Sequence, residues 1–179
     1  MKIALDVDGV LADVIIPWLT YSNTVRPKIS KQEITNWEFW KEFKINPFDF
    51  YSELNNCWKD WNSIPPTEKN LSDITKSLLD IGQVDIVTAR EHSTNSYVIN
   101  WLNHHGISYD NYVSVIDGPM KAALDYDVFI DDSPLNATKF LKNKKKVFLY
   151  SQPWNQNFPE ENVHRISNLS EAIEQIKLN

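Results

Sequence analysis

The chain has 179 residues, of which 42% are hydrophobic, so it is long enough for one well-buried domain with a small inserted subdomain. Its formal net charge of -6 argues against a general affinity for nucleic-acid backbones or anionic membranes, because both need a basic surface. The single cysteine, Cys57, excludes an internal disulfide, and no apolar run reaches membrane-spanning length. We therefore expect a soluble, cytoplasmic protein that binds neither membranes nor, in any stable way, nucleic acids.

The first apolar run, "MKIALDVDGVLADV", predicts a short buried strand over Lys2–Leu5. Lys2 before apolar residues is also how a signal peptide begins, but carboxylates interrupt this run too early for one. Two of them, Asp6 and Asp8, close the strand and are followed by Gly9. Carboxylates are seldom buried without a partner, so their place at a strand end calls for a functional explanation.

Residues 14–68 have a different composition from the rest of the chain. They are rich in Trp, Phe and Tyr, contain several prolines, and show no alternating strand pattern. We predict an irregular, mostly helical insertion, a cap, after the first strand. The predicted core then consists of residues 1–13 and 69–179.

From residue 69 onward, short apolar runs alternate with helical patterns, which is typical of βαβ units and a parallel sheet. The predicted strands are Val84–Val87, Tyr112–Ile116, Val128–Ile130 and Val147–Tyr150. The predicted helices are Leu71–Leu79, Thr94–His105, Leu135–Leu141 and Leu169–Ile176. The fold class is therefore α/β, with a Rossmann-like parallel sheet covered by helices on both faces.

Polar residues follow or separate the predicted strands in a consistent order. They are Asp6 and Asp8, then Thr88, Ala89 and Arg90, then Lys121, then Asp131 and Asp132. Taken singly, each motif has a structural explanation, since Asp-x-Asp-Gly also forms turns or parts of calcium loops, and Asp-Asp-Ser-Pro also caps helices. Taken together, they meet where an open parallel sheet binds its ligands, beyond the carboxyl ends of its strands.

So many carboxylates in one place require a cation. Two unit charges about 4 Å apart repel by about 4 kcal/mol at an effective dielectric constant near 20. A hard divalent ion such as Mg²⁺ relieves this repulsion through oxygen ligands. An acidic Mg²⁺ site with a lysine and a hydroxyl is suited to a phosphoryl group.

The motifs "LDVDGVLADV", "IVTAR", Lys121 and "FIDDSP" resemble the four motifs of the haloacid dehalogenase superfamily of phosphatases. Four features resemble the 5'(3')-deoxyribonucleotidase family, including its bacterial and phage-type members. They are the residues of the first motif, the tryptophan-rich insertion, "IDDSP" and "QPWN". The resemblance implies a Mg²⁺-dependent phosphatase that acts on (deoxy)nucleoside monophosphates through an aspartyl-phosphate.

The resemblance also implies roles for the core residues. Asp6 would be the nucleophile and a metal ligand, whereas Asp8 would be the general acid and base and would offer its backbone carbonyl to the metal. Thr88 and the Ala89 amide would bind the phosphate, and Lys121 would offset its charge. Asp131 and Asp132 would hold Mg²⁺; we favour Asp132 as the direct ligand, although sequence cannot separate two adjacent carboxylates.

Three further positions lie in or near the cap. Arg90 departs from the animal enzymes and is either a phosphate or sugar contact or a surface residue. Most cap aromatics are expected to form its core; Trp18, closest in sequence to the catalytic turn, is predicted to stack on the base. Val14 stands where animal members tend to carry an aromatic that contacts the base, so base preference stays open.

Other functions remain as alternatives. A polynucleotide 3'-phosphatase and a general small-phosphate hydrolase use the same motifs, although net acidity disfavours a long nucleic-acid substrate. A phospho-accepting receiver module, from a different class of protein, also combines aspartates, a threonine and a lysine on a parallel sheet. Its acidic pair and acceptor aspartate come early, whereas here the second aspartate pair follows Lys121. Regiochemistry, sugar preference and oligomeric state are left open.

Overall fold

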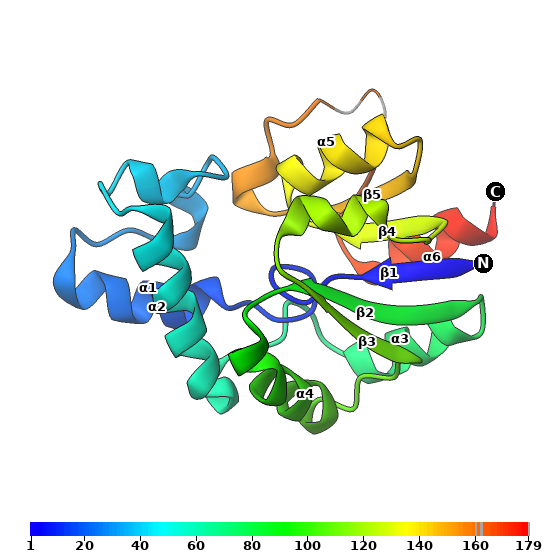
Figure 1. Ribbon diagram of the computed structural model, residues 1–179, viewed down its shortest axis with the longest axis horizontal. Helices are drawn as coiled ribbons and strands as arrows, with labels where there is room; N and C mark the ends of the chain where they lie inside the picture. Colours follow the sequence, from blue (N-terminus) through cyan, green and yellow to red (C-terminus); the bar gives the residue numbers. More distant parts are fainter. Residues whose placement is uncertain (160, 162, 179) are drawn as a thin grey trace.

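The computed structural model describes residues 1–159, 161 and 163–178, and it contains a six-stranded sheet in the order β3-β2-β1-β4-β5-β6 (Figure 1). Every pairing in the sheet is parallel, as the sequence predicts. The strands are β1 Lys2–Leu5, β2 Gln83–Ala89, β3 Asn111–Val115, β4 Val128–Asp131, β5 Lys146–Tyr150 and β6 His164–Ile166. Strands β2 and β3 are added on one side of β1, whereas β4, β5 and β6 are added on the other side. A ligand crevice is therefore expected at the carboxyl ends of β1 and β4, where the strand order reverses.

Helices cover both faces of this sheet, as predicted. They are α3 Leu71–Leu79, α4 Asn95–His104, α5 Pro134–Lys142 and α6 Leu169–Lys177. Successive side chains of a strand point to opposite faces, so Ile3 packs with residues of α3, α4 and α6, whereas Ala4 packs with residues of α5. The α/β class with a Rossmann-like core is thus confirmed.

Local signals in the sequence explain where the helices begin. Pro134 occupies the first turn of α5, and the Ser133 hydroxyl accepts a hydrogen bond from the Asn136 amide at 3.3 Å. The Asn168 side chain accepts from the Glu171 amide at 3.0 Å and so caps α6. β6 was not predicted, because it has only three residues and two of them are polar.

The aromatic segment is mainly helical. It contains α1 Ile15–Val25 and α2 Pro47–Lys59, together with short 3-10 turns. In Figure 1 both helices lie beyond the carboxyl ends of β1 and β2, and the two chain termini lie at the far end of the sheet. Among the described residues, no helix is both long and apolar enough to cross a membrane.

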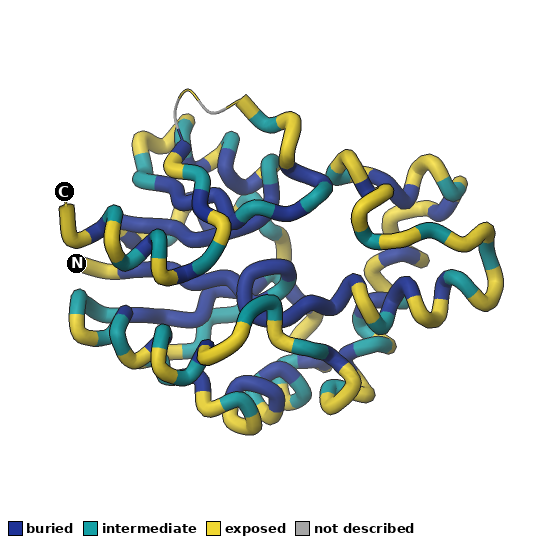
Figure 2. Tube along the Cα trace, turned by 180° about the vertical axis from the view of Figure 1, so that it is seen from behind, coloured by how far each residue is buried: buried dark blue, intermediate teal, exposed yellow. Residues whose placement is uncertain are grey.

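The segments at which the chain enters and leaves the cap run side by side. The Asp13 amide donates to the Pro65 carbonyl at 2.9 Å, and the Thr67 amide donates to the Leu11 carbonyl at 2.9 Å. The loop after β1 is buried apart from Asp8, which is half-buried, and Figure 2 shows this loop as mainly buried. The division into a core of residues 1–13 and 69–179 and a cap of residues 14–68 stays a prediction, and this pairing agrees with it.

Candidate active site

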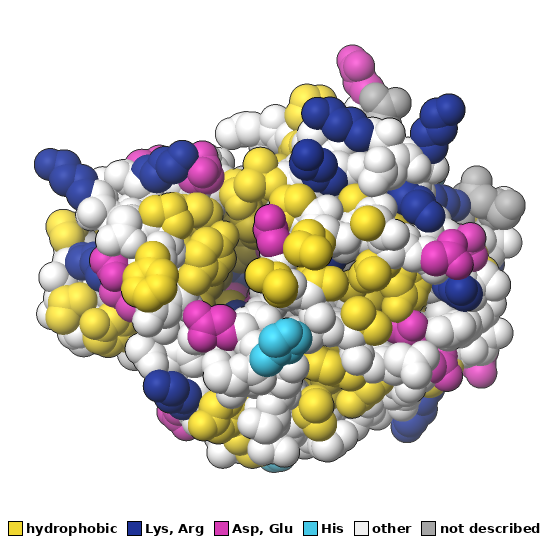
Figure 3. Space-filling model, viewed as in Figure 1, with side chains coloured by type: hydrophobic (Ala, Val, Ile, Leu, Met, Phe, Trp, Pro, Cys, Tyr) yellow, Lys and Arg dark blue, Asp and Glu magenta, His cyan; other side chains and the backbone are white. Residues whose placement is uncertain are grey.

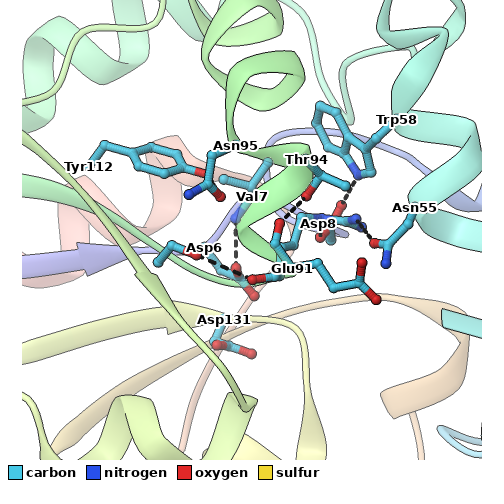
Figure 4. Close-up of polar contacts among 12 residues, drawn as sticks. Asp6, Val7, Asp8, Asn55, Trp58, Glu91, Thr94, Asn95, Tyr112 and Asp131 are labelled. Carbon is cyan, nitrogen blue, oxygen red and sulfur yellow. Dashed lines mark hydrogen bonds and ion pairs between the residues drawn. The ribbon is translucent and has the colours of Figure 1, made fainter. Parts of the chain in front are cut away.

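Three buried carboxylates meet at the carboxyl ends of β1 and β4. Asp6 directly follows β1, and its amide donates to the Ile130 carbonyl of β4 at 3.0 Å. Asp131 ends β4 and Asp132 follows it. One carboxylate oxygen from each of the three lies within 4.8 Å of the others. Figure 4 shows Asp6 and Asp131 among the polar groups that surround them.

Lys121 lies among these carboxylates. It belongs to the 3-10 segment Gly118–Ala123, and its Nζ lies 2.9 Å from both Asp6 Oδ2 and Asp131 Oδ2. Burial alone would lower the pKa of Lys121, but Asp131 and Asp6 outweigh burial and hold this pKa above its usual range. The lysine is therefore a permanent cation in the site.

One lysine does not balance three carboxylates. Burial raises the pKa of Asp6 to about 7; Asp131 adds to this rise and Lys121 opposes it. Burial, followed by the neighbouring Asp131, also raises the pKa of Asp132 well above its usual range. A bound cation would therefore stabilise the cluster, and carboxylate oxygens are the ligands that Mg²⁺ prefers.

The two adjacent aspartates differ in their hydrogen bonds. Asp131 accepts from Lys121 Nζ at 2.9 Å, from the Ser133 amide at 2.9 Å, and from Asn136 Nδ2 at 3.1 and 3.2 Å, so both of its oxygens are occupied. Asp132 accepts on Oδ2 from Trp154 Nε1 at 2.9 Å, which leaves its Oδ1 available. Asp132 is thus better placed to bind a metal directly, and Asp131 to hold Lys121.

The structure explains why the Asp-x-Asp-Gly motif has a glycine at position 9. Its φ is +75°, and a Cβ built there would lie 2.1 Å from Asp132 Oδ2. Any other residue would be strained and would occupy the space beside the Asp132 carboxylate.

The "QPWN" segment supports the site, a role that the sequence reasoning missed. It follows β5, and Gln152 Nε2 donates to the Gly9 carbonyl at 2.6 Å. Asn155 Nδ2 donates to the Asp132 backbone carbonyl at 2.8 Å, and Trp154 Nε1 donates to the Asp132 side chain. Its position in the sequence could have predicted this role, because the segment follows a predicted strand, as the residues of the four motifs do.

Thr88 carries an unsatisfied hydroxyl. Its side chain is fully buried, and Oγ1 has no hydrogen-bond partner among the described residues. A buried polar group without a partner is costly and calls for an explanation, and a bound ligand would provide one. Here that ligand would be a phosphate oxygen near Asp6, which directly follows the neighbouring strand β1.

Arg90 is buried, so the surface alternative for it is wrong. Its Nε lies 2.5 Å from Asp8 Oδ2, and its Nη1 donates to Asn55 Oδ1 at 3.0 Å. Trp58 Nε1 donates to the other oxygen of Asp8 at 3.0 Å. Asp8 thus has one partner that directly follows β2 and another on cap helix α2, and neither belongs to the cluster around Asp6.

A cleft of about 440 Å³ opens above these groups, within the size range of small-molecule sites. Asp6, Asp8, Lys121 and Asp132 line it together with Ala89 and Arg90. The cap contributes an apolar wall, which consists of Val14, Ile15, Trp37, Phe39, Trp40, Phe50, Tyr51 and Leu54. Figure 3 shows the hollow, bordered by hydrophobic side chains on both sides.

Trp18 does not line this cleft, contrary to the prediction. It is fully buried inside the cap, where its ring packs edge-on against Phe39 and Phe50 at centroid distances of 5.4 and 5.3 Å. Its Nε1 donates to Glu53 Oε2 at 3.0 Å. A side chain enclosed in this way stabilises the cap and cannot stack on a ligand.

The chain matches, over residues 1–179, the model of a protein family described as 5' nucleotidase, deoxy (pyrimidine), cytosolic type C protein. It belongs to this nucleotidase family. A 5'(3')-deoxyribonucleotidase of Bacillus subtilis is 27% identical to it over 94% of each chain. It is therefore a phosphomonoester hydrolase, and the resemblance seen in its motifs is confirmed.

Solved structures show the same fold at low identity. A haloacid dehalogenase-like hydrolase of Streptococcus pneumoniae superposes with a TM-score of 0.68 at 13% identity, covering 97% of each chain. The D,D-heptose 1.7-bisphosphate phosphatase of B. bronchiseptica, solved with magnesium and phosphate, gives a TM-score of 0.54 at 14% identity over 99% of each chain. The fold is thus that of the haloacid dehalogenase superfamily.

Proposed function

We propose that this protein is a cytoplasmic, Mg²⁺-dependent 5'(3')-deoxyribonucleotidase that dephosphorylates (deoxy)nucleoside monophosphates through an aspartyl-phosphate on Asp6. The observation that carries the proposal is a buried Asp6–Lys121 pair, 2.9 Å apart, in a cleft with an aromatic wall. The polar groups suit a phosphate, and the aromatic wall suits a nucleobase.

Asp6 is held ready for attack. The Val7 amide donates to its Oδ1 at 2.7 Å and Lys121 contacts its Oδ2, so the plane of the carboxylate is fixed. Its oxygen attacks phosphorus, and the bond from phosphorus to the nucleoside oxygen breaks as Asp8 gives that oxygen a proton. Water then attacks the phosphoryl group and loses its proton to Asp8, so that phosphate leaves and Asp6 is restored.

The phosphoryl oxygens need donors during both steps. Thr88 Oγ1, the Ala89 amide and Lys121 Nζ are the groups of this chain that supply them. Mg²⁺ would be held by Asp6, the Asp8 carbonyl and Asp132, and it would neutralise charge on the phosphoryl group. Asp131 would act on the site through Lys121.

The alternatives have weaker support. The cleft mouth carries Glu91 and Asp117, which would repel the backbone of a polynucleotide. A general hydrolase of small phosphates would have no use for the aromatic wall. The receiver module is not supported, because the family to which the chain belongs is one of nucleotidases.

A substrate panel tests the proposal. With Mg²⁺, phosphate release is measured from deoxy- and ribonucleoside 5'- and 3'-monophosphates, from a 3'-phosphorylated oligonucleotide and from glycerol phosphate. We expect the deoxynucleoside monophosphates to be turned over fastest, and Asp6→Asn to lose roughly 10⁴-fold or more in kcat. The exposed Asp73→Asn serves as a matched control. Faster turnover of the oligonucleotide or of glycerol phosphate than of every nucleotide, or full activity of Asp6→Asn, would overturn the proposal.

The two adjacent aspartates predict different responses to metal. Calorimetric titration with Mg²⁺ should show affinity falling by about 10²-fold or more in Asp132→Asn, since a direct ligand is lost, and by about tenfold in Asp131→Asn. The opposite ranking would make Asp131 the direct ligand.

A further inference from the structure

Asp8 is held by partners that belong to neither the metal cluster nor the phosphate-binding groups. Its Oδ2 accepts from Arg90 Nε at 2.5 Å, and its Oδ1 accepts from Trp58 Nε1 at 3.0 Å. Arg90 follows β2, and Trp58 lies on cap helix α2. Figure 4 shows Trp58 and Asn55 reaching from this helix toward Asp8.

The two donors are themselves fixed. Arg90 Nη1 donates to Asn55 Oδ1 at 3.0 Å, and the guanidinium carbon lies 5.0 Å from the centroid of the Trp58 ring, a cation–π distance. Trp58 is fully buried and packs edge-on against Trp101 of α4, with centroids 6.3 Å apart. Neither donor can turn away from Asp8 without disturbing the other.

One donor on each oxygen fixes the plane and the rotamer of a carboxyl group while leaving further lone-pair positions open to the cleft. We propose that Arg90 and Trp58, braced by Asn55, form a clamp that positions Asp8 for proton transfer to and from the leaving oxygen. The inference rests on the proposed function, in which Asp8 is the general acid and base. Arg90 and Trp58 are then positioning residues rather than contacts of the phosphate or sugar.

The clamp also makes the proton-transfer step depend on the cap. Two of its three members, Asn55 and Trp58, belong to α2, whereas Asp8 lies in the loop after β1 and Arg90 directly follows β2. A cap that is not docked would leave Asp8 with only Arg90. The geometry thus links cap position to the proton transfer and not to phosphate binding.

The leaving group distinguishes this role from a phosphate contact. A nucleoside alkoxide is a poor leaving group and needs a proton, whereas p-nitrophenolate departs with little help. Loss of the clamp should therefore lower kcat/KM for a deoxynucleoside 5'-monophosphate but hardly for p-nitrophenyl phosphate. A direct phosphate contact would affect both esters alike.

The variants are Trp58→Phe, which keeps an aromatic ring but removes the N–H, and Arg90→Lys, which keeps the charge. We expect each to lower the ratio of kcat/KM for the nucleotide to kcat/KM for p-nitrophenyl phosphate roughly tenfold or more. A lysine should not substitute, because an ammonium group lacks the planar fork that reaches Asp8 and Asn55 together. Melting temperatures check that each variant is folded, and if Trp58→Phe is not, Arg90→Lys carries the test.

A second readout comes from the other half of the reaction. Asp8 must take a proton from water to release phosphate from Asp6, so a misplaced Asp8 should let the phosphoenzyme accumulate. With p-nitrophenyl phosphate, Trp58→Phe should give a burst of p-nitrophenolate close to one equivalent of enzyme. Intact-mass measurement should detect the phosphorylated chain.

Trp101→Phe is the matched control. Trp101 is equally buried in the same cluster, but its Nε1 donates to the Ile64 carbonyl at 2.8 Å and not to Asp8. It should leave the ratio unchanged and give no burst. Equal losses on both esters in Trp58→Phe and Arg90→Lys, or the same shift in Trp101→Phe, would overturn the clamp. A wild-type protein that hydrolyses neither ester would instead overturn the proposed function.

Discussion

The two sides of the cleft are built on different principles. On the core side, polar groups at or near strand ends make specific contacts, as Lys121 does with Asp6 and Asp131. On the cap side, aromatic rings pack on one another, as Trp40 stacks on Phe50 with ring centroids 4.5 Å apart and an interplanar angle of 18°. The core side concentrates charge that is unfavourable without ligands, whereas the cap side supplies shape and apolar surface.

This contrast separates stability from function. Burial of aromatic rings stabilises the cap, because dispersion and the hydrophobic effect add up over many contacts. Burial of Asp6 and Asp132 destabilises the metal-free core, because desolvation disfavours their charged forms. Substitutions on the two sides should therefore change different measured quantities.

The largest expected effect is on the stability of the cap. Trp18→Ala should lower the free energy of unfolding by about 3–5 kcal/mol, because it leaves a cavity among Phe39 and Phe50 and removes one hydrogen bond to Glu53. Tyr51→Ala, at a half-exposed ring on the cleft wall, should hardly change this free energy but should raise KM for a nucleotide about tenfold and leave KM for glycerol phosphate unchanged. Urea unfolding and steady-state kinetics measure both. A stable Trp18→Ala protein with a raised nucleotide KM would reverse the contrast.

The next effect is electrostatic and depends on pH. The pKa of folded Asp6 is about 7, above the ordinary value of 3.8, so between these values the folded protein binds more protons than the unfolded chain. This carboxylate therefore removes stability as pH rises from about 4 to about 7, by a few kcal/mol at about 1.4 kcal/mol per pKa unit. In EDTA, Asp6→Asn should match the wild type in stability near pH 4 and exceed it at pH 8. Mg²⁺ should abolish that advantage by stabilising only the wild type, and an advantage that shrinks as pH rises would contradict the prediction.

The same contrast shows what the sequence could and could not predict. Strand-end reasoning worked on the core side because parallel strands bring their carboxyl ends to one edge whatever the spacing along the chain. It brought Arg90, which follows β2, to the same edge as Asp8, although it did not predict their contact. It could not find Trp58, which lies 50 residues from Asp8 on a cap helix and not at a strand end. Nothing local distinguishes Trp58 from the other tryptophans of the cap.

On the cap side, nearness in sequence was a poor guide. Trp18 is close to the catalytic turn, but the buried positions of α1 are Ile15, Trp18, Leu19 and Ser22. This is the i, i+3, i+4, i+7 spacing of one helix face, and that face points into the cap core. The helical period, applied to the cap as it was to the core, would have placed Trp18 inside.

The smallest effect on stability separates two buried threonines. Thr88 Oγ1 has no hydrogen-bond partner in the described part of the chain, whereas Thr75 Oγ1 donates to the Leu71 carbonyl at 2.9 Å and accepts from the Ser108 amide at 3.1 Å. Thr88→Val should leave the free energy of unfolding unchanged or raise it by up to about 1 kcal/mol, because a methyl group replaces an unpaired hydroxyl on a strand. It should nevertheless lower kcat/KM by about 10²-fold, since a donor to the phosphoryl group is lost.

Thr75→Val makes the same chemical change where the hydroxyl is paired. It should lower the free energy of unfolding by about 1–3 kcal/mol, because the Ser108 amide loses its hydrogen-bond acceptor. It should leave kcat/KM unchanged. Thermal unfolding and steady-state kinetics of both variants test whether one substitution changes only activity and the other only stability. If Thr88→Val instead destabilised the protein with full activity, its hydroxyl would have a structural partner, and the phosphate would be bound without it.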